Sequence, residues 1–185
     1  MNFYPIVRSV SCRCWLGLSL STLLSACFQE PFFSDTPQIN FEGFSKYTLP
    51  AEAGVGRQKR DSLVITLSFT DGNGDLGNSL PISNQEMAQY MQAGGWGNYK
   101  IRTFRLENKQ YKELPSGENT FLVFPFLTRE GKKSAIQGSL DLRQSYPYSI
   151  PNKLYPTKFR IQIRDRAFHV SNEIETDTIS LPYSY

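Results

Sequence analysis

The clearest pattern along the chain is an alternation of apolar and polar residues with a period of two. From Ser62 to Thr70 every second residue is large and apolar, and the residues between are small or polar apart from Val64. The alternation recurs over Ile136–Leu142 and over Lys158–Arg164, where Arg164 falls on the polar side. Successive side chains of a strand point to opposite faces, so each segment is predicted to be a strand with one buried face.

Four further segments carry a weaker form of this pattern: Gln38–Phe44, Tyr99–Leu106, Thr120–Leu127 and Glu173–Leu181. Clusters of Gly, Pro, Asn and Asp, which favour turns, bound many of the seven segments. The Tyr- and Pro-rich stretch Tyr146–Pro156 is predicted to be a surface crossover between strands. Seven short strands separated by turns predict an all-β fold, and specifically an antiparallel immunoglobulin-like β-sandwich.

One segment, Leu80–Gly97, departs from the strand pattern and predicts a short helical insert. The sequence Ser-Asn-Gln-Glu at Ser83–Glu86 has the spacing of a capping box, which marks the start of a helix. Met87, Tyr90 and Met91 follow at helical spacing, so we expect them to form one apolar face of the helix.

The first 26 residues have the three-part order of a secretory signal. Arg8 and Arg13 precede an apolar run from Trp15 to Leu24, and no acidic residue is present. A membrane-spanning helix needs about 20 apolar residues, so this run is too short to remain in the bilayer. It ends in a Leu-Ser-Ala-Cys sequence at Cys27, which resembles the lipobox of bacterial lipoproteins.

The thiol of Cys27 is the nucleophile that can accept a diacylglyceryl group, and after cleavage we expect the residue to carry a fatty acid as well. The predicted organisation is therefore a signal peptide (1–26), a lipidated tether (27–36) and a β-sandwich domain (37–185). Each buried methylene adds about 0.8 kcal/mol of membrane affinity, so several acyl chains make a durable anchor. We expect a cell-envelope protein attached by lipid to the outer membrane. The alternative is an ordinary signal peptide, or a buried helix, followed by a chance cysteine.

Removal of the signal changes the composition of the chain. Two arginines leave with it, which lowers the formal net charge from +3 to about +1. Cys12 and Cys14 also leave and Cys27 is acylated, so the mature domain has no thiol for a disulfide or a zinc site. A near-neutral chain without a run of Lys and Arg lacks the features of nucleic-acid-binding proteins. We therefore expect no nucleic-acid partner.

Candidate chemistry is concentrated in Phe69–Gly77, which reads Phe-Thr-Asp-Gly-Asn-Gly-Asp-Leu-Gly. Side-chain oxygens recur at Asp71, Asn73 and Asp75, and the glycines between them permit the left-handed backbone that wraps a loop around a cation. Calcium takes six to eight oxygen ligands, of which these side chains and backbone carbonyls would supply about half. The loop is not an EF-hand, because leucine stands where that motif has glycine. The alternative is that Asp-Gly and Asn-Gly form only a tight turn.

A second acidic position, Asp165, is predicted to lie beside this loop. If Ser62–Thr70 and Lys158–Arg164 are the second and sixth strands of a sandwich, the loops that follow them open at the same pole. Asp165 would then complete a calcium site begun in the earlier loop. The alternative is that Asp165 pairs with Arg166 or caps a turn.

These features together resemble uncharacterised envelope lipoproteins of the Bacteroidota. The similarity rests on the lipobox at Cys27, on the Phe69–Gly77 loop, and on Asp165-Arg166-Ala167 followed by Ser171-Asn172, about a fifth of the chain. The resemblance implies an immunoglobulin-like domain of the cell envelope, with no established activity.

We therefore expect a non-catalytic module that presents its loops to another envelope protein. The alternative is glycan binding through Trp96 and Tyr99, although such aromatic residues are also common at the edge of a core. An enzyme is disfavoured because His169 is the one histidine, no thiol remains, and common catalytic motifs are missing. The exception is a carboxylate pair such as Asp71 with Asp165, which would suit hydrolysis of a glycosidic bond.

Overall fold

The computed structural model describes residues 32–52, 56–115, 121–128 and 134–184. The predicted signal peptide and Cys27 lie outside the described residues. Phe32–Tyr185 forms one compact unit, and its hydrophobic core is made by residues between Ile39 and Leu181. The described residues of this unit therefore contain a hydrophobic core of their own.

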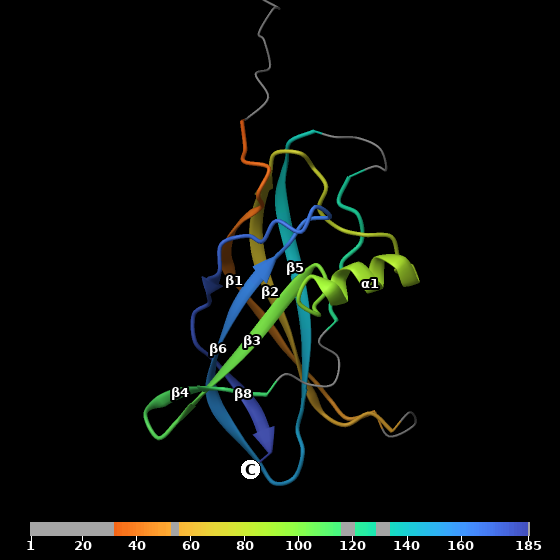
Figure 1. The fold of residues 1–185 in the computed structure, drawn as a ribbon. Helices are drawn as coiled ribbons and strands as arrows, with labels where there is room; N and C mark the ends of the chain where they lie inside the picture. Colours follow the sequence, from red (N-terminus) through yellow and green to blue (C-terminus); the bar gives the residue numbers. More distant parts are fainter. Residues whose placement is uncertain (1–31, 53–55, 116–120, 129–133, 185) are drawn as a thin grey trace, which may run out of the picture. The chain divides into compact units, whose positions relative to one another are not determined.

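The unit is built from two antiparallel sheets and one helix (Figure 1). The first sheet has the order β1-β2-β5, formed by β1 (Gln38–Leu49), β2 (Arg60–Asp71) and β5 (Ile136–Pro147). The second has the order β4-β3-β6, formed by β3 (Tyr99–Glu107), β4 (Gln110–Glu113) and β6 (Asn152–Ile163). The short strands β7 (Ile174–Glu175) and β8 (Ile179–Ser184) both pair with β6.

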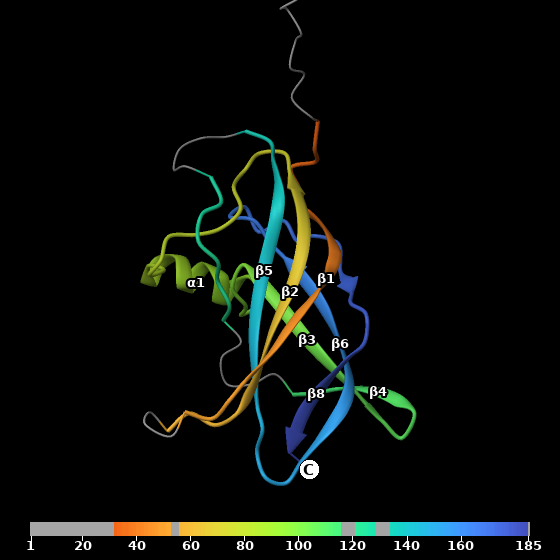
Figure 2. The same ribbon diagram turned by 180° about the vertical axis from the view of Figure 1, so that it is seen from behind.

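The alternating segments form the inner faces of these two sheets, which lie one behind the other in Figures 1 and 2. Along β2 every second residue is buried, and along β6 the same alternation holds from Thr157 to Ile163. The core side chains of both strands belong to one hydrophobic cluster. The predicted all-β, sandwich-like architecture is therefore confirmed.

Two predictions about the connections are wrong. Within the described part of Thr120–Leu127 there are only isolated bridges, at Leu122 and Pro125, and no strand. Tyr146–Pro156, predicted to be a crossover, is mostly strand. Pro156 is tolerated because residues 152–156 pair with β8 on one side, while pairing with β3 begins at Thr157. Proline has no N–H to donate, so it suits a position with one unpaired edge.

The predicted helix is present as α1 (Asn84–Gln92), which lies beside the two sheets in Figure 1. Ser83 accepts a hydrogen bond from the backbone N–H of Glu86 (3.2 Å), and the Glu86 carboxylate accepts one from the backbone N–H of Ser83 (2.9 Å). The capping box is therefore confirmed. Of the predicted apolar face, Tyr90 is buried, whereas Met87 and Met91 are 37% and 57% exposed. In the described residues no helix is both long and apolar enough to cross a bilayer.

Candidate functional site

The loops that follow β2 and β6 meet at one pole of the sandwich, at the upper end of Figure 1. The backbone N–H and the Nε of Arg166 both donate to the carbonyl oxygen of Asp75, at 3.3 and 3.1 Å. The prediction that these two loops are neighbours is confirmed. We call this end, with Asp71, Asp75 and Asp165, the acidic pole.

Asp71 is the last residue of β2, and it continues the inward-facing side of that strand. Its side chain is fully buried, and neither carboxylate oxygen has a hydrogen-bond partner. The Oδ1 atom of Asp75 is also buried without a partner. Buried polar groups are hydrogen-bonded in the great majority of cases, so two such carboxylates side by side require an explanation.

The electrostatics of the acidic pole are unfavourable for ionised carboxylates. Burial, followed by repulsion from Asp75 and Asp165, raises the pKa of Asp71 from 3.8 to about 6. The backbone N–H groups of Gly74 and Asp75 lower this pKa slightly, although neither makes a hydrogen bond of normal geometry with Asp71. Burial and Asp165 also raise the pKa of Asp75, which the charge of Arg166 partly opposes. The pole would therefore gain from an additional positive charge.

Asp165 is fully buried like Asp71, but its carboxylate is engaged by His169. One oxygen accepts the backbone N–H of His169 at 2.8 Å, and the other lies 2.8 Å from the ring Nδ1 of the same residue. This contact raises the pKa of the imidazole. Asp165 therefore closes the turn that follows β6, as the turn-capping alternative expected, and it makes no ion pair with Arg166.

Asn73 has a local role as well, because its Oδ1 accepts the backbone N–H of Asp75 at 3.2 Å. Gly74 has a φ of 67°, and a Cβ at this position would lie 2.3 Å from the carbonyl oxygen of Ser134. Asn73 and Gly74 thus make the tight turn that these residue types favour. The turn brings Asp75 back beside Asp71, so turn formation and cation binding are compatible.

The described residues contain no group of three or more His, Cys, Asp or Glu side chains arranged to hold a metal ion. A cation at the acidic pole would therefore depend on Asp71, Asp75 and backbone carbonyl oxygens, rather than on the four side chains expected from the sequence. Comparisons with protein-family models, curated proteins and solved structures found no match.

Arg164 is a buried residue that the alternation pattern placed on the polar face, and that prediction is wrong. The side chain is 1% exposed because β6 ends at Ile163 and the chain then bends beneath α1. Its guanidinium donates to four backbone carbonyls, those of Tyr90, Ala93, Trp96 and Gly97. Burial lowers its pKa. Arg164 therefore fixes the end of α1 and the following loop, and no local signal in the sequence indicates this.

The two aromatic residues considered for glycan binding pack against the protein. The ring of Trp96 lies over the guanidinium of Arg164, with 4.0 Å between the guanidinium carbon and the ring centroid. Tyr99 is half-buried, and its ring packs beside Phe124 at a centroid distance of 6.0 Å. Trp96 and Tyr99 thus each pack on another residue rather than forming a shared open surface. Glycan binding through this pair remains an untested prediction.

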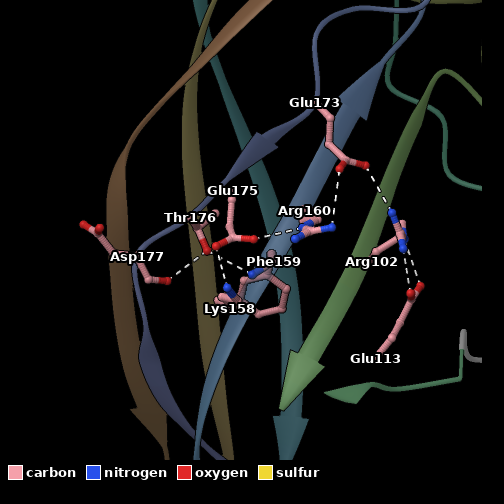
Figure 3. A network of polar contacts seen from close by, with 9 residues as sticks. All are labelled: Arg102, Glu113, Lys158, Phe159, Arg160, Glu173, Glu175, Thr176 and Asp177. Carbon is pink, nitrogen blue, oxygen red and sulfur yellow. Dashed lines mark hydrogen bonds and ion pairs between the residues drawn. The ribbon is translucent and has the colours of Figure 1, made fainter. Parts of the chain in front are cut away.

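A second polar cluster, which the sequence analysis did not find, covers the outer face of β3, β6 and β7 (Figure 3). Arg102 makes a two-pronged contact with Glu113 at 2.9 and 2.6 Å, and Arg160 donates to Glu175 at 2.9 Å. Glu173 lies between the two arginines, at 3.3 and 3.9 Å. Since each of these charges already faces an opposite charge, the cluster offers a ligand little and mainly covers the sheet.

Proposed function

We propose that this protein is a lipid-anchored, non-catalytic module of the cell envelope whose acidic pole binds a divalent cation, with calcium as the best fit. The observation that carries the proposal is the fully buried carboxylate of Asp71, which has no hydrogen-bond partner for either oxygen. Bound calcium would hold the loops at this pole in one arrangement, so that they present a fixed surface to a partner protein.

A buried carboxylate without hydrogen bonds can be stabilised in more than one way. Burying an ionised group without a partner is very costly, so the group takes up a proton or pairs with a cation. With a pKa of about 6, Asp71 is mostly ionised at neutral pH and repels Asp75. Arg166 donates to a carbonyl of the loop rather than to either carboxylate. A divalent cation would satisfy both aspartates at once.

The available ligands favour calcium over magnesium. Asp71 and Asp75 offer three buried carboxylate oxygens without partners, and backbone carbonyls of the surrounding loop would complete the shell. Calcium accepts irregular shells of carboxylates and carbonyls, whereas magnesium needs a near-octahedral shell and usually keeps several waters. A fully buried Asp71 leaves little room for such waters. Asp165 would remain outside the first shell, since His169 occupies both of its oxygens.

The order of the strands supports the immunoglobulin-like part of the proposal. The first sheet, β1-β2-β5, corresponds to strands A-B-E of that fold. The second, β4-β3-β6 with β7 and β8, corresponds to C′-C-F-G. In this topology the loops after the second and sixth strands share one pole, and in antibody variable domains that pole binds the partner. Such an analogy of fold supports an interaction role without identifying a partner.

Burial argues against the hydrolase alternative. Asp71 and Asp165 are both fully buried, so a glycosidic bond cannot approach the two carboxylates in this arrangement. A general acid must come within hydrogen-bond reach of the atom that it protonates. We therefore interpret the buried Asp71 as a cation ligand rather than as an acid catalyst.

The proposal is tested by thermal unfolding of the purified protein at neutral pH, in excess calcium and in chelator. A ligand that binds only the folded state adds about 2.7 kcal/mol of stability when its concentration is a hundredfold its dissociation constant. For a domain of this size we expect calcium to raise the unfolding midpoint by roughly 5 to 10 °C. Equal midpoints in calcium and chelator would rule out the cation site.

Two substitutions on β2 make the test specific. Asp71→Asn should abolish the effect of calcium and should raise the midpoint in chelator, because it removes a buried unpaired charge. Asp61→Asn is the matched control, since Asp61 is equally buried on the same face but accepts hydrogen bonds from Thr48 and Tyr148. It should lower the midpoint under both conditions and leave the calcium effect intact. If both variants respond to calcium as the wild type does, Asp71 is not a ligand.

A further inference from the structure

The end of the sandwich opposite the acidic pole is formed by two adjacent connections. One is the hairpin between β1 and β2, and the other is the turn 148–151, which joins β5 of the first sheet to β6 of the second. They lie side by side because Arg60 pairs with Pro147, and the backbone N–H of Tyr148 donates to the carbonyl of Lys59 at 2.9 Å. Since β2 runs from Arg60 to Asp71, this end, which we call the hairpin pole, lies a full strand length from the acidic pole.

The hairpin pole carries an excess of positive charge among its described residues. Its basic residues are Arg57, Lys59, Arg60 and Lys153. Arg57 and Arg60 share one carboxylate, that of Glu52, at 3.7 and 3.8 Å. The other nearby acid, Asp61, is fully buried and already bound by Thr48 and Tyr148. Arg57 and Arg60 therefore share one exposed carboxylate, whereas Lys153 lines a separate hollow together with Glu107.

Two features give this charged pole the shape of a binding surface. An open groove of about 440 Å³ is lined by both arginines of the hairpin together with Gln58 and Pro147. Ile150 lies in the turn between β5 and β6 and is 95% exposed, and Leu154, near the start of β6, is 50% exposed. Apolar side chains that project from a ring of basic ones are typical of proteins that lie at a membrane interface.

We propose that the hairpin pole binds an anionic phospholipid surface, with Arg57 and Arg60 contacting lipid phosphates and Ile150 entering the apolar layer. Guanidinium groups form paired hydrogen bonds with phosphate oxygens, which suits an open groove between two arginines. An acidic protein partner would satisfy the charges as well. However, it would gain little from one isoleucine that projects beyond the charged groove, whereas a bilayer surface contacts the projecting tip first.

Vesicle flotation tests this proposal with residues 28–185, which contain the whole core and lack both the signal and Cys27. Binding is compared between phosphatidylcholine vesicles and vesicles that also contain phosphatidylglycerol, in the presence of chelator. We expect at least tenfold stronger binding to the anionic vesicles, since each basic residue near such a surface contributes on the order of a fivefold gain. Added salt should weaken this binding.

Variants at the pole and matched controls elsewhere locate the contact. The double change Arg57→Gln with Arg60→Gln should reduce binding roughly 25-fold. Separately, Ile150→Ser should reduce it roughly tenfold. Arg143→Gln and Met91→Ser remove an exposed charge and an exposed apolar side chain elsewhere, so they should change binding less than twofold. Circular dichroism of each variant establishes that it is folded.

Four outcomes would overturn the proposal. Equal binding to neutral and anionic vesicles would exclude phosphate recognition, and undiminished binding of the hairpin variants would exclude this pole. Binding that appears only with calcium and disappears in Asp71→Asn would place the lipid contact at the acidic pole. Loss of a co-purified protein in the hairpin variants, without any vesicle binding, would identify an acidic protein as the partner. The comparison of vesicles and variants in chelator does not depend on whether the acidic pole binds calcium.

Discussion

At the residue scale, the two ends of β2 show how context decides the fate of an identical side chain. Asp61 and Asp71 both face inward and both are fully buried. Asp61 accepts hydrogen bonds from Thr48 at 2.8 Å and Tyr148 at 3.3 Å, and Lys46 lies 3.6 Å away. Asp71 has no such partner and is repelled by two further aspartates. The first is a structural residue, whereas the second is the strongest candidate for ligand binding.

Asp71 also predicts an unusual dependence of stability on pH. Its pKa is about 6 in the folded protein, compared with 3.8 for an aspartate in the unfolded chain. Between these values the unfolded state loses its proton first, so the contribution of Asp71 to stability falls as pH rises. The difference corresponds to about 3 kcal/mol between pH 3 and pH 7. Urea unfolding of wild type and Asp71→Asn across this range, in chelator, measures it.

The comparison isolates Asp71 from the other titrating groups. The stability of Asp71→Asn relative to wild type should increase from low to neutral pH, because only the wild type loses stability through this group. A difference that is constant with pH would contradict the raised pKa. With calcium present at neutral pH the order should reverse, since the ionised carboxylate is the form that binds the cation.

At the element scale, two asparagine side chains replace strand pairing. Asn98 is buried and exchanges two hydrogen bonds with the backbone of Phe124, at 2.8 and 3.0 Å. Asn172 makes the same exchange with the backbone of Ile39, at 2.8 and 2.8 Å. An amide side chain carries the same donor and acceptor as a peptide group, so it can bind one residue of a neighbouring segment. Together with backbone hydrogen bonds to Leu76, Asn78 and Tyr99, Asn98 therefore holds residues 121–128 in place without a strand.

Substitution of Asn98 tests this role. Asn98→Ala leaves the backbone N–H of Phe124 buried without a partner, while the Phe124 carbonyl still accepts the backbone N–H of Asn78 at 3.1 Å. The loss should destabilise the protein by about 1 to 3 kcal/mol. Hydrogen exchange should lose its protection at the amide of Phe124. Asn172→Ala is the matched control, because it should affect the amide of Ile39 and leave that of Phe124 protected. Unchanged exchange at Phe124 in Asn98→Ala would show that other contacts hold the segment.

At the scale of the whole molecule, the sandwich is electrically polarised along its strands. Three aspartates gather at one pole, and four basic residues gather at the other. The chain enters the domain at the acidic pole, where the carbonyl of Ser34 accepts the N–H of Gly72 at 2.8 Å. A tether from Cys27 would therefore attach beside the proposed cation site, at the opposite end of the domain from the hairpin pole.

Removal of the anchor is the test at this scale. Cys27→Ala should eliminate labelling with radioactive palmitate and should release the protein from the outer-membrane fraction. The variant should still unfold cooperatively, because Cys27 lies outside the residues that form the core. Undiminished labelling of Cys27→Ala would contradict lipidation at this position.

The sequence by itself determined the features that depend on residues close together in the chain. Alternation predicted β2, which ends at Asp71, and β6, which ends just before Asp165. A four-residue motif predicted the start of α1. The sequence also predicted that the two acidic loops are neighbours, because in a sandwich the direction of each strand decides the pole at which it ends.

The tertiary structure decided which polar groups find partners. Asn98, Arg164 and Asp61 meet their partners only after folding, and several of these lie more than 20 residues away. No periodicity encodes such a meeting, so the pattern placed Arg164 on the surface and predicted a strand at 120–127. For the same reason the isolation of Asp71, on which the proposed function rests, could be recognised only from the folded protein.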